Sequence, residues 1–158
     1  MFDLSSVKFV LCGAAPLGKD TSMQLEALFQ KGGAKIRQGW GMSEATCSIT
    51  IFAPDEFDPA HLGVGFLCAN MQAKIVDDQG QEVGFDQEGE AVVRGPNVFK
   101  GYWGNDAATK EAWTNDGWLK TGDYVVVRSD GLFMVVDRKK VYQAFQNGIW
   151  VLIVVFRN

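Results

Sequence analysis

The chain has 158 residues, of which 47% are hydrophobic and 22% are charged, and its formal net charge is −4. This is the composition of an ordinary globular protein that can bury a core, so it excludes a disordered chain. No block rich in lysine and arginine stands out, so we expect no nucleic-acid partner.

The N-terminal part of the chain predicts a strand, a helix and a second strand. Val7–Cys12 is a short, mostly apolar run that predicts a buried strand. Asp20–Lys31 carries apolar residues at helical spacing, and two glycines end the pattern. Ala34–Gln38 is predicted to be another short strand. A strand, helix and strand within about thirty residues form a parallel βαβ unit, whose loops after the strands commonly bind ligands.

The middle of the chain alternates short strand-like runs with turn signals, which predicts a small antiparallel sheet or a barrel-like subdomain. A helix is predicted over Asp106–Trp113, with Asn105 or Asp106 as its N-cap. The fold class is therefore α/β, a βαβ portion followed by this β-rich part, with the two joined near Pro54–Leu62. The predicted strands are Gln72–Asp77, Gly89–Arg94, Trp118–Thr121, Asp123–Arg128 and Leu132–Val136.

The end of the chain holds an apolar run, Ile149–Phe156, which is far shorter than the ~20 residues that span a bilayer. We expect no transmembrane segment, and we expect this run either to be buried or to mediate self-association. A cytoplasmic location is expected because no signal peptide and no Ser-Lys-Leu peroxisomal address is present. The cysteines lack metal-site spacing, so we expect buried, reduced thiols at Cys12, Cys47 and Cys68.

The first candidate motif runs from Gly13 to Lys19 and, taken alone, matches the G-x-x-x-x-G-K pattern of a phosphate-binding loop. That pattern continues with a Ser or Thr that binds magnesium, whereas this chain has Asp20. Pro16 also removes one backbone N–H that would contact phosphate. A P-loop nucleotide hydrolase and a plain strand-to-helix turn stay open as alternatives for this motif.

The second motif, Gln38–Glu44, places two glycines beside Trp40 and follows them with Ser43 and Glu44. Glycines let the backbone approach a flat ligand closely, next to an aromatic ring. A hydroxyl and a carboxylate can together hold phosphate and magnesium. Glu44 alone would be a solvated surface carboxylate, so it is the concentration of these groups in seven residues that indicates a binding site.

Two further motifs carry charged residues at strand ends. Asp123 closes the segment Gly117–Asp123, and an ionised carboxylate could accept hydrogen bonds from two ribose hydroxyls. The alternative is a turn aspartate that caps its own backbone. The segment Val135–Lys140 ends a predicted strand with a charged cluster, for which the alternative is a solvated strand end.

The order and spacing of these motifs resemble the adenylate-forming (AMP-binding) superfamily, which includes acyl-CoA synthetases, 4-coumarate–CoA ligases, firefly-type luciferases and peptide-synthetase adenylation domains. The resemblance covers about residues 2–140 and is nearest to 4-coumarate–CoA ligase-like and medium-chain acyl-CoA ligases. It rests on the segments GAAPLGKD at 13–20, QGWGMSEAT at 38–46, the block at 89–123 and VVDRKK at 135–140.

The resemblance implies a role for each matching residue. Ser43 would contact phosphate and Glu44 would help to hold Mg2+, so these two residues are the candidate catalytic residues. Trp40 would stack on adenine, Asp123 would bind the ribose hydroxyls, and Arg138 would contact the ribose at a hinge. The nucleotide and acyl pockets would be lined by Gly13, Ala14, Ala15, Gly39, Gly41 and Met42.

The resemblance also implies a reaction and an organisation. A small-molecule carboxylic acid would be joined to coenzyme A with ATP, giving AMP and pyrophosphate. Residues 1–60 would belong to the parallel α/β subdomain, 61–137 to a small β-rich subdomain, and 138–158 to the hinge and a divergent tail. The family's upstream phosphate loop and C-terminal lysine domain have no match here, so we expect a fragment that is inactive alone. The alternative is a non-catalytic nucleotide-binding or remnant module.

Overall fold

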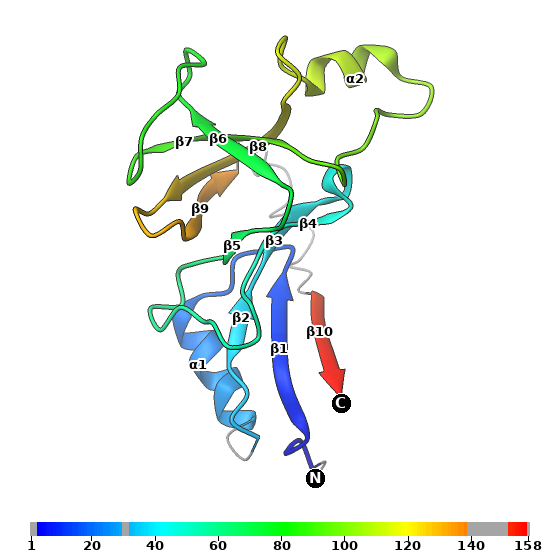
Figure 1. Ribbon diagram of the computed structural model, residues 1–158. Coiled ribbons are helices and arrows are strands. Elements are labelled where there is room, and N and C mark those ends of the chain that lie inside the picture. Colours follow the sequence, from blue (N-terminus) through cyan, green and yellow to red (C-terminus); the bar gives the residue numbers. More distant parts are fainter. Residues whose placement is uncertain (1–2, 30–31, 139–151, 158) are drawn as a thin grey trace.

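A computed structural model describes residues 3–29, 32–138 and 152–157. Its N-terminal part contains strand β1 (Val7–Gly13), helix α1 (Lys19–Leu28) and strand β2 (Ile36–Gln38) (Figure 1). β2 pairs with β1 in parallel, which confirms the predicted βαβ unit. The helix ends at Leu28, and the backbone N–H of its C-cap Phe29 donates to the carbonyl of Glu26 at 2.9 Å.

The βαβ unit has its own buried cluster because one face of β1 is apolar. Val7, Val10 and Cys12 of β1 are each 1% exposed and pack with Ala34 and Ile36. The half-buried Leu25 of α1 and Phe29, the C-cap residue of this helix, cover the cluster. The helix therefore lies on the sheet by its apolar stripe, and the loop after β1 is left free to shape a site.

A second sheet follows directly and was not predicted from the sequence. Strands β3 (Trp40–Met42), β4 (Cys47–Ile51) and β5 (Phe66–Leu67) are antiparallel neighbours in the order β3-β4-β5. A short 3-10 helix, η1 (Ser43–Ala45), joins β3 to β4. The Gln38–Glu44 motif thus lies on strand ends and a tight turn.

A third sheet contains β6 (Gln72–Val76), β7 (Glu88–Arg94), β8 (Leu119–Val127) and β9 (Phe133–Arg138), all antiparallel and in this order. The predicted antiparallel sheet is confirmed, and among the described residues it is open rather than closed into a barrel. The predicted helix is α2 (Asp106–Ala112), and its N-cap Asn105 accepts the Ala108 N–H at 3.0 Å.

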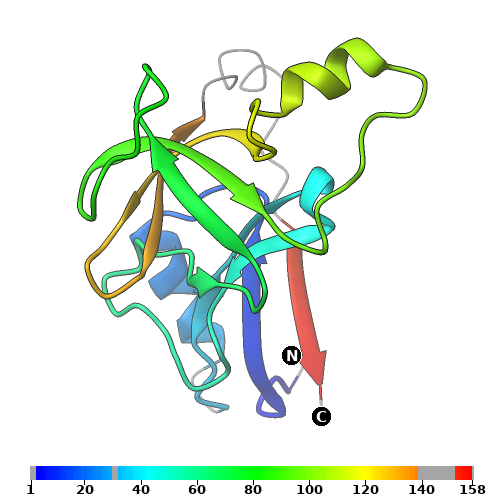
Figure 2. The same cartoon turned by 45° about the horizontal axis from the view of Figure 1, so that its top comes forward.

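The second and third sheets share one core. Trp40, Ile49 and Val64 from the β3–β5 region pack against buried residues of the four-stranded sheet. The four-stranded sheet and α2 therefore lie at one end of the molecule and the βαβ unit at the other, with β3–β5 between them (Figures 1 and 2). The residues contributed by the four-stranded sheet include Ala91, Val93, Leu119, Val125 and Phe133.

The apolar end of the chain forms strand β10 (Leu152–Arg157), which pairs antiparallel with β1 from Val7 opposite Arg157 to Gly13 opposite Leu152. β1 therefore lies between β2 and β10, in one three-stranded sheet. Residues 152–156 of the predicted apolar run are thus paired within the same chain, and residues 149–151 lie outside the described residues. None of the described helices is both long and apolar enough to span a membrane.

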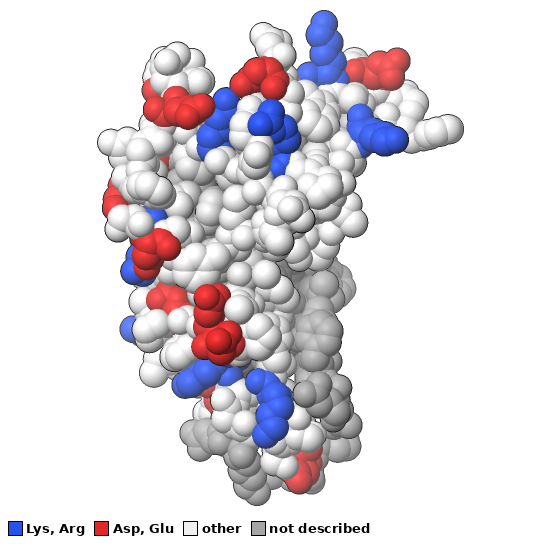
Figure 3. Space-filling view, in the orientation of Figure 1, with Lys and Arg blue, Asp and Glu red and all other residues white. Residues whose placement is uncertain are grey.

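The burial of the cysteines differs from expectation at two positions. Cys12, Cys47 and Cys68 are free, but only Cys12 is buried. Cys47, which lies at the η1–β4 turn, is exposed and Cys68 is half-buried, so the prediction of buried thiols was wrong at these two residues. On the face shown in Figure 3, lysine and arginine side chains are interspersed with aspartate and glutamate.

Candidate functional site

The loop after β1 and the turn between β2 and β3 lie against each other. The N–H of Gly39 donates to the carbonyl of Cys12 at 2.9 Å, and a Cβ on Gly13 would lie 3.3 Å from the carbonyl oxygen of Gly39. Ala14 has a φ of 72°, a left-handed conformation that few residues other than glycine adopt. The predicted backbone residues Gly13, Ala14 and Gly39 are thus brought together, next to Ala15.

Gln38 holds the loop in place through its side-chain amide. The Leu17 N–H donates to Gln38 Oε1 at 2.8 Å, and Gln38 Nε2 donates to the Leu17 carbonyl at 3.1 Å. Gln38 Nε2 also donates to the carbonyl of His61 at 3.2 Å. One N–H of the loop is therefore already used within the chain, which disfavours a phosphate-binding role for this loop's amides.

Trp40 and Asp123 meet in the core although they are 83 residues apart in the sequence. The indole Nε1–H of Trp40 donates to Asp123 Oδ2 at 2.8 Å. Trp40 is 7% exposed and Asp123 is 5% exposed, and the Trp40 ring stacks on Phe133 with ring centroids 6.2 Å apart. A buried carboxylate without hydrogen-bond donors would destabilise the folded state, so this hydrogen bond is expected to contribute strongly to the stability of the fold.

Gly41, the residue after Trp40, allows β3 and β4 to approach each other closely. A Cβ at Gly41 would lie 1.5 Å from the carbonyl oxygen of Cys47, so no side chain fits. The next residue, Met42, is half-buried and packs against the shared core. Gly41 and Met42 thus follow Trp40 along β3, and their predicted place beside the acyl group stays a prediction.

Arg138 lies opposite Asp123 in the antiparallel pairing of β8 with β9. The backbones of these two predicted ribose-binding residues are therefore neighbours. The position of the Arg138 side chain lies outside what the structure describes. Asp123 is held on its own strand, because its N–H donates to Thr121 Oγ1 at 3.1 Å and Thr121 Oγ1 donates to the Ala91 carbonyl at 2.7 Å.

Ser43 and Glu44 begin the η1 turn, where Ser43 is exposed and Glu44 is half-buried. The phenol of Tyr102 donates to Glu44 Oε1 at 2.7 Å, and the N–H of Phe99 donates to the Glu44 carbonyl at 2.7 Å. The hydrogen bond to Glu44 raises the pKa of Tyr102, and burial adds to this. Sequence reasoning missed Tyr102, since nothing in its local pattern points to a residue so distant in the chain.

The donor set around Glu44 suits a magnesium ion that is shared with a nucleotide. Within the described part of the chain, no three His, Cys, Asp or Glu side chains are grouped to hold a metal. Magnesium is commonly held by one or two carboxylates together with substrate phosphates, without a dedicated protein cage. Glu44 supplies one such carboxylate and Ser43 an adjacent hydroxyl.

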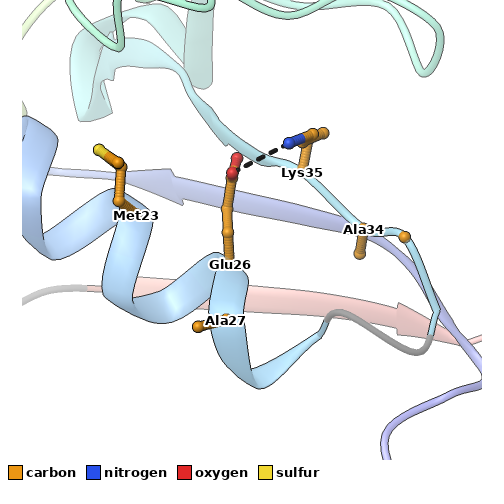
Figure 4. Close-up of a pocket in the computed structure, with 6 residues that line it drawn as sticks. Met23, Glu26, Ala27, Ala34 and Lys35 are labelled. Atoms are coloured by element: carbon orange, nitrogen blue, oxygen red, sulfur yellow. Dashed lines mark hydrogen bonds and ion pairs between the residues drawn. The ribbon is translucent and has the colours of Figure 1, made fainter.

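A separate pocket of about 310 Å3 lies between α1 and the chain that leads into β2 (Figure 4). Its charged groups, Glu26 and Lys35, form an ion pair at 3.1 Å. Glu26 Oε1 also accepts the Ile36 N–H at 3.1 Å, so this carboxylate serves to join α1 to β2. None of the candidate site residues lines this pocket.

The fold and the paired motifs are those of one family of enzymes. The chain belongs to the AMP-binding enzyme family, whose model matches residues 1–103.

Among curated relatives, the chain is 42% identical to 4-coumarate–CoA ligase-like 6 of rice (Oryza sativa subsp. japonica) over 139 residues, which are 87% of this chain and 23% of the relative. It is 40% identical to 4-coumarate–CoA ligase 1 of Arabidopsis thaliana over 152 residues, 92% of this chain and 27% of the relative. The chain thus spans about a quarter of the length of these relatives.

Solved structures give the same family. The long-chain-fatty-acid–CoA ligase of Archaeoglobus fulgidus superposes with a TM-score of 0.79 at 29% identity, over 87% of this chain and 29% of that one. ATP-bound MatB from Rhodopseudomonas palustris superposes with a TM-score of 0.73 at 33% identity, over 82% of this chain and 25% of that one.

Proposed function

We propose that the chain supplies the adenine- and ribose-binding part of an ATP-dependent, AMP-forming carboxylic acid–CoA ligase. The observation that carries the proposal is the 2.8 Å hydrogen bond between Trp40 and Asp123, which joins two motifs across 83 residues. Relatives named as CoA ligases and the ATP-bound MatB structure support it. The acid itself is a small carboxylic acid whose class these residues do not define.

The proposed roles follow the geometry around this bond. The close-packed backbone of Gly13, Ala14 and Gly39 would flank a flat base, and the Trp40 ring would stack on it. Asp123 would accept hydrogen bonds from the ribose hydroxyls, with Arg138 beside it on the next strand. Because Trp40 and Asp123 are nearly buried here, nucleotide entry requires local movement of the side chains that cover them.

The proposed reaction has two displacements. A carboxylate oxygen of the acid attacks the α-phosphorus of ATP, and the bond to pyrophosphate breaks. The thiol of coenzyme A then attacks the acyl carbonyl, and AMP leaves. Ser43 would contact phosphate and Glu44 would help to hold magnesium, which would supply neutralisation of the charge on the phosphate oxygens.

We further propose that the 158 residues, produced by themselves, bind nucleotide but turn it over poorly. Residues that span about a quarter of a relative's length would lack many of its electrostatic contacts. Losing one such group typically costs about 10²–10³-fold in rate. The rival proposal, a non-catalytic remnant, predicts aggregation of the chain rather than a soluble monomer in size-exclusion chromatography.

Calorimetry with Mg2+ and ATP tests the proposal on four versions of the chain. Wild type should bind, and Asp123→Asn and Glu44→Gln should each weaken binding about tenfold, since hydrogen bonds to charged groups contribute about 1.5–3 kcal/mol. Lys19→Ala should leave binding unchanged, because Lys19 is exposed and outside the proposed site. Loss of binding in Lys19→Ala alone would favour the P-loop alternative, and brisk pyrophosphate release with mixed carboxylic acids would refute the inactive fragment.

A further inference from the structure

The segment from Asn97 to Tyr102 forms hydrogen bonds with both the side chain and the backbone of Glu44. The Tyr102 phenol donates to Glu44 Oε1 at 2.7 Å, across 58 residues of sequence. The N–H of Phe99 donates to the Glu44 carbonyl at 2.7 Å. The side chain and the main chain of one residue are thus fixed by the same distant segment, an arrangement that local turn geometry does not require.

The same segment also holds the rest of the η1–β4 turn. Asn97 Nδ2 donates to the carbonyls of Ala45 at 2.8 Å and Ser48 at 3.1 Å. Thr46, at a left-handed φ of 48°, donates from Oγ1 to the Asn97 carbonyl at 2.7 Å. These bonds stabilise a strained turn, so the backbone that carries Glu44 is fixed independently of the contact between Tyr102 and the Glu44 carboxylate.

Tyr102 is itself held in position. Its backbone N–H donates a hydrogen bond to Oγ1 of Thr109, a residue of α2, at 2.8 Å. Its ring meets Phe99 edge-on, with centroids 4.9 Å apart, and Phe99 stacks on Trp113 at 6.2 Å. The phenol is therefore directed at Glu44 by contacts on two sides, although Tyr102 remains 39% exposed.

The chemistry of this contact suits orientation of a metal-binding carboxylate. A phenol is a neutral donor, so it fixes one oxygen of Glu44 without cancelling the negative charge, whereas Lys or Arg would cancel it. Magnesium demands near-ideal octahedral geometry, which favours a carboxylate held in one orientation. Hydrogen bonds to a ligating carboxylate typically change metal affinity by about 10–100-fold.

We propose that Tyr102 is a positioning residue that orients the Glu44 carboxylate toward the magnesium ion of a bound magnesium–ATP complex. This inference rests on the proposed function, in which Glu44 holds magnesium. It adds a residue that was not among the predicted site residues, and it gives the segment Asn97–Tyr102 a role in metal binding as well as in packing.

The test compares ATP affinity with and without magnesium in the whole chain. Isothermal titration calorimetry with ATP is run in EDTA and over a Mg2+ series, for wild type and Tyr102→Phe. Tyr124→Phe is the matched control, because Tyr124 also donates its phenol to a carboxylate, that of Asp78, on another part of the surface. Circular dichroism melts establish that each variant is folded.

We expect Tyr102→Phe to raise the half-saturating Mg2+ concentration about tenfold while leaving ATP affinity in EDTA unchanged, and Tyr124→Phe to match wild type throughout. An unchanged Mg2+ requirement in Tyr102→Phe overturns the inference and leaves the proposed function standing. An equal loss of ATP affinity in EDTA also overturns it, since Tyr102 then acts only on the fold. A wild-type chain that binds no ATP under any condition overturns the proposed function and the role of Tyr102 together.

Discussion

Replacing Trp40 with phenylalanine keeps an aromatic ring but deletes the N–H that donates to Asp123. The acceptor is a carboxylate in a residue that is 5% exposed, so water cannot readily replace the lost donor. Hydrogen bonds to charged groups contribute about 1.5–3 kcal/mol to stability. The smaller ring also leaves space beside Phe133, which adds a packing cost that has nothing to do with the hydrogen bond.

A double-mutant cycle separates these two effects. Urea unfolding followed by circular dichroism is measured for wild type, Trp40→Phe, Asp123→Ala and the double variant. The packing cost cancels in the cycle, and the coupling free energy between the two positions should be about 1.5–3 kcal/mol. A coupling below about 0.5 kcal/mol would be no larger than that of independent sites, and it would refute the view that this bond joins the two motifs.

Two further outcomes follow from the structure. Gly41→Ala should abolish cooperative thermal unfolding, because its Cβ would lie 1.5 Å from the Cys47 carbonyl oxygen, while Gly18→Ala, with no atom within 4 Å of the added Cβ, should melt like wild type. Burial acts to raise the pKa of Asp58, but the N–H groups of Gly63, Leu62 and Ala60 outweigh it and lower that pKa below its usual value. The resulting stability is present above the unfolded pKa of about 3.9 and is lost as the pH falls through the lower folded value. Asp58→Asn should therefore be less stable than wild type in urea unfolding at neutral pH, with the difference disappearing in acid; a constant difference would contradict this.

Much of the fold could be predicted from the sequence because its elements carry local signals. The βαβ unit follows from apolar periodicity, and α2 from a capping residue at Asn105 that the structure confirms. Two predicted strands, 118–121 and 123–128, are instead parts of the single strand β8. Gly122, the residue between them, has a φ of 71°, yet its N–H donates to Glu90 Oε1 at 3.2 Å on the neighbouring strand and the pairing continues through β8.

The candidate site could be predicted only in part, because motifs state which groups matter and not where they point. The sequence indicated Trp40 and Asp123 separately, yet nothing in it indicated that one donates a hydrogen bond to the other. Strand β3 was missed because glycines at 39 and 41 flank Trp40 and carry little strand propensity, and its pairing with β4 depends on the close approach at Gly41. Tyr102 was missed because its contact with Glu44 is created by tertiary packing alone and leaves no local signal in the sequence.

The position of β1 has a practical consequence for anyone who shortens this polypeptide. β1 has a paired strand on each side, and β10 covers one whole side of it. A version trimmed after residue 140 would bare a row of amide and carbonyl groups along that side, and such rows recruit strands from other molecules. Precipitation of a trimmed version would then report a missing neighbour strand and would say nothing about the nucleotide chemistry.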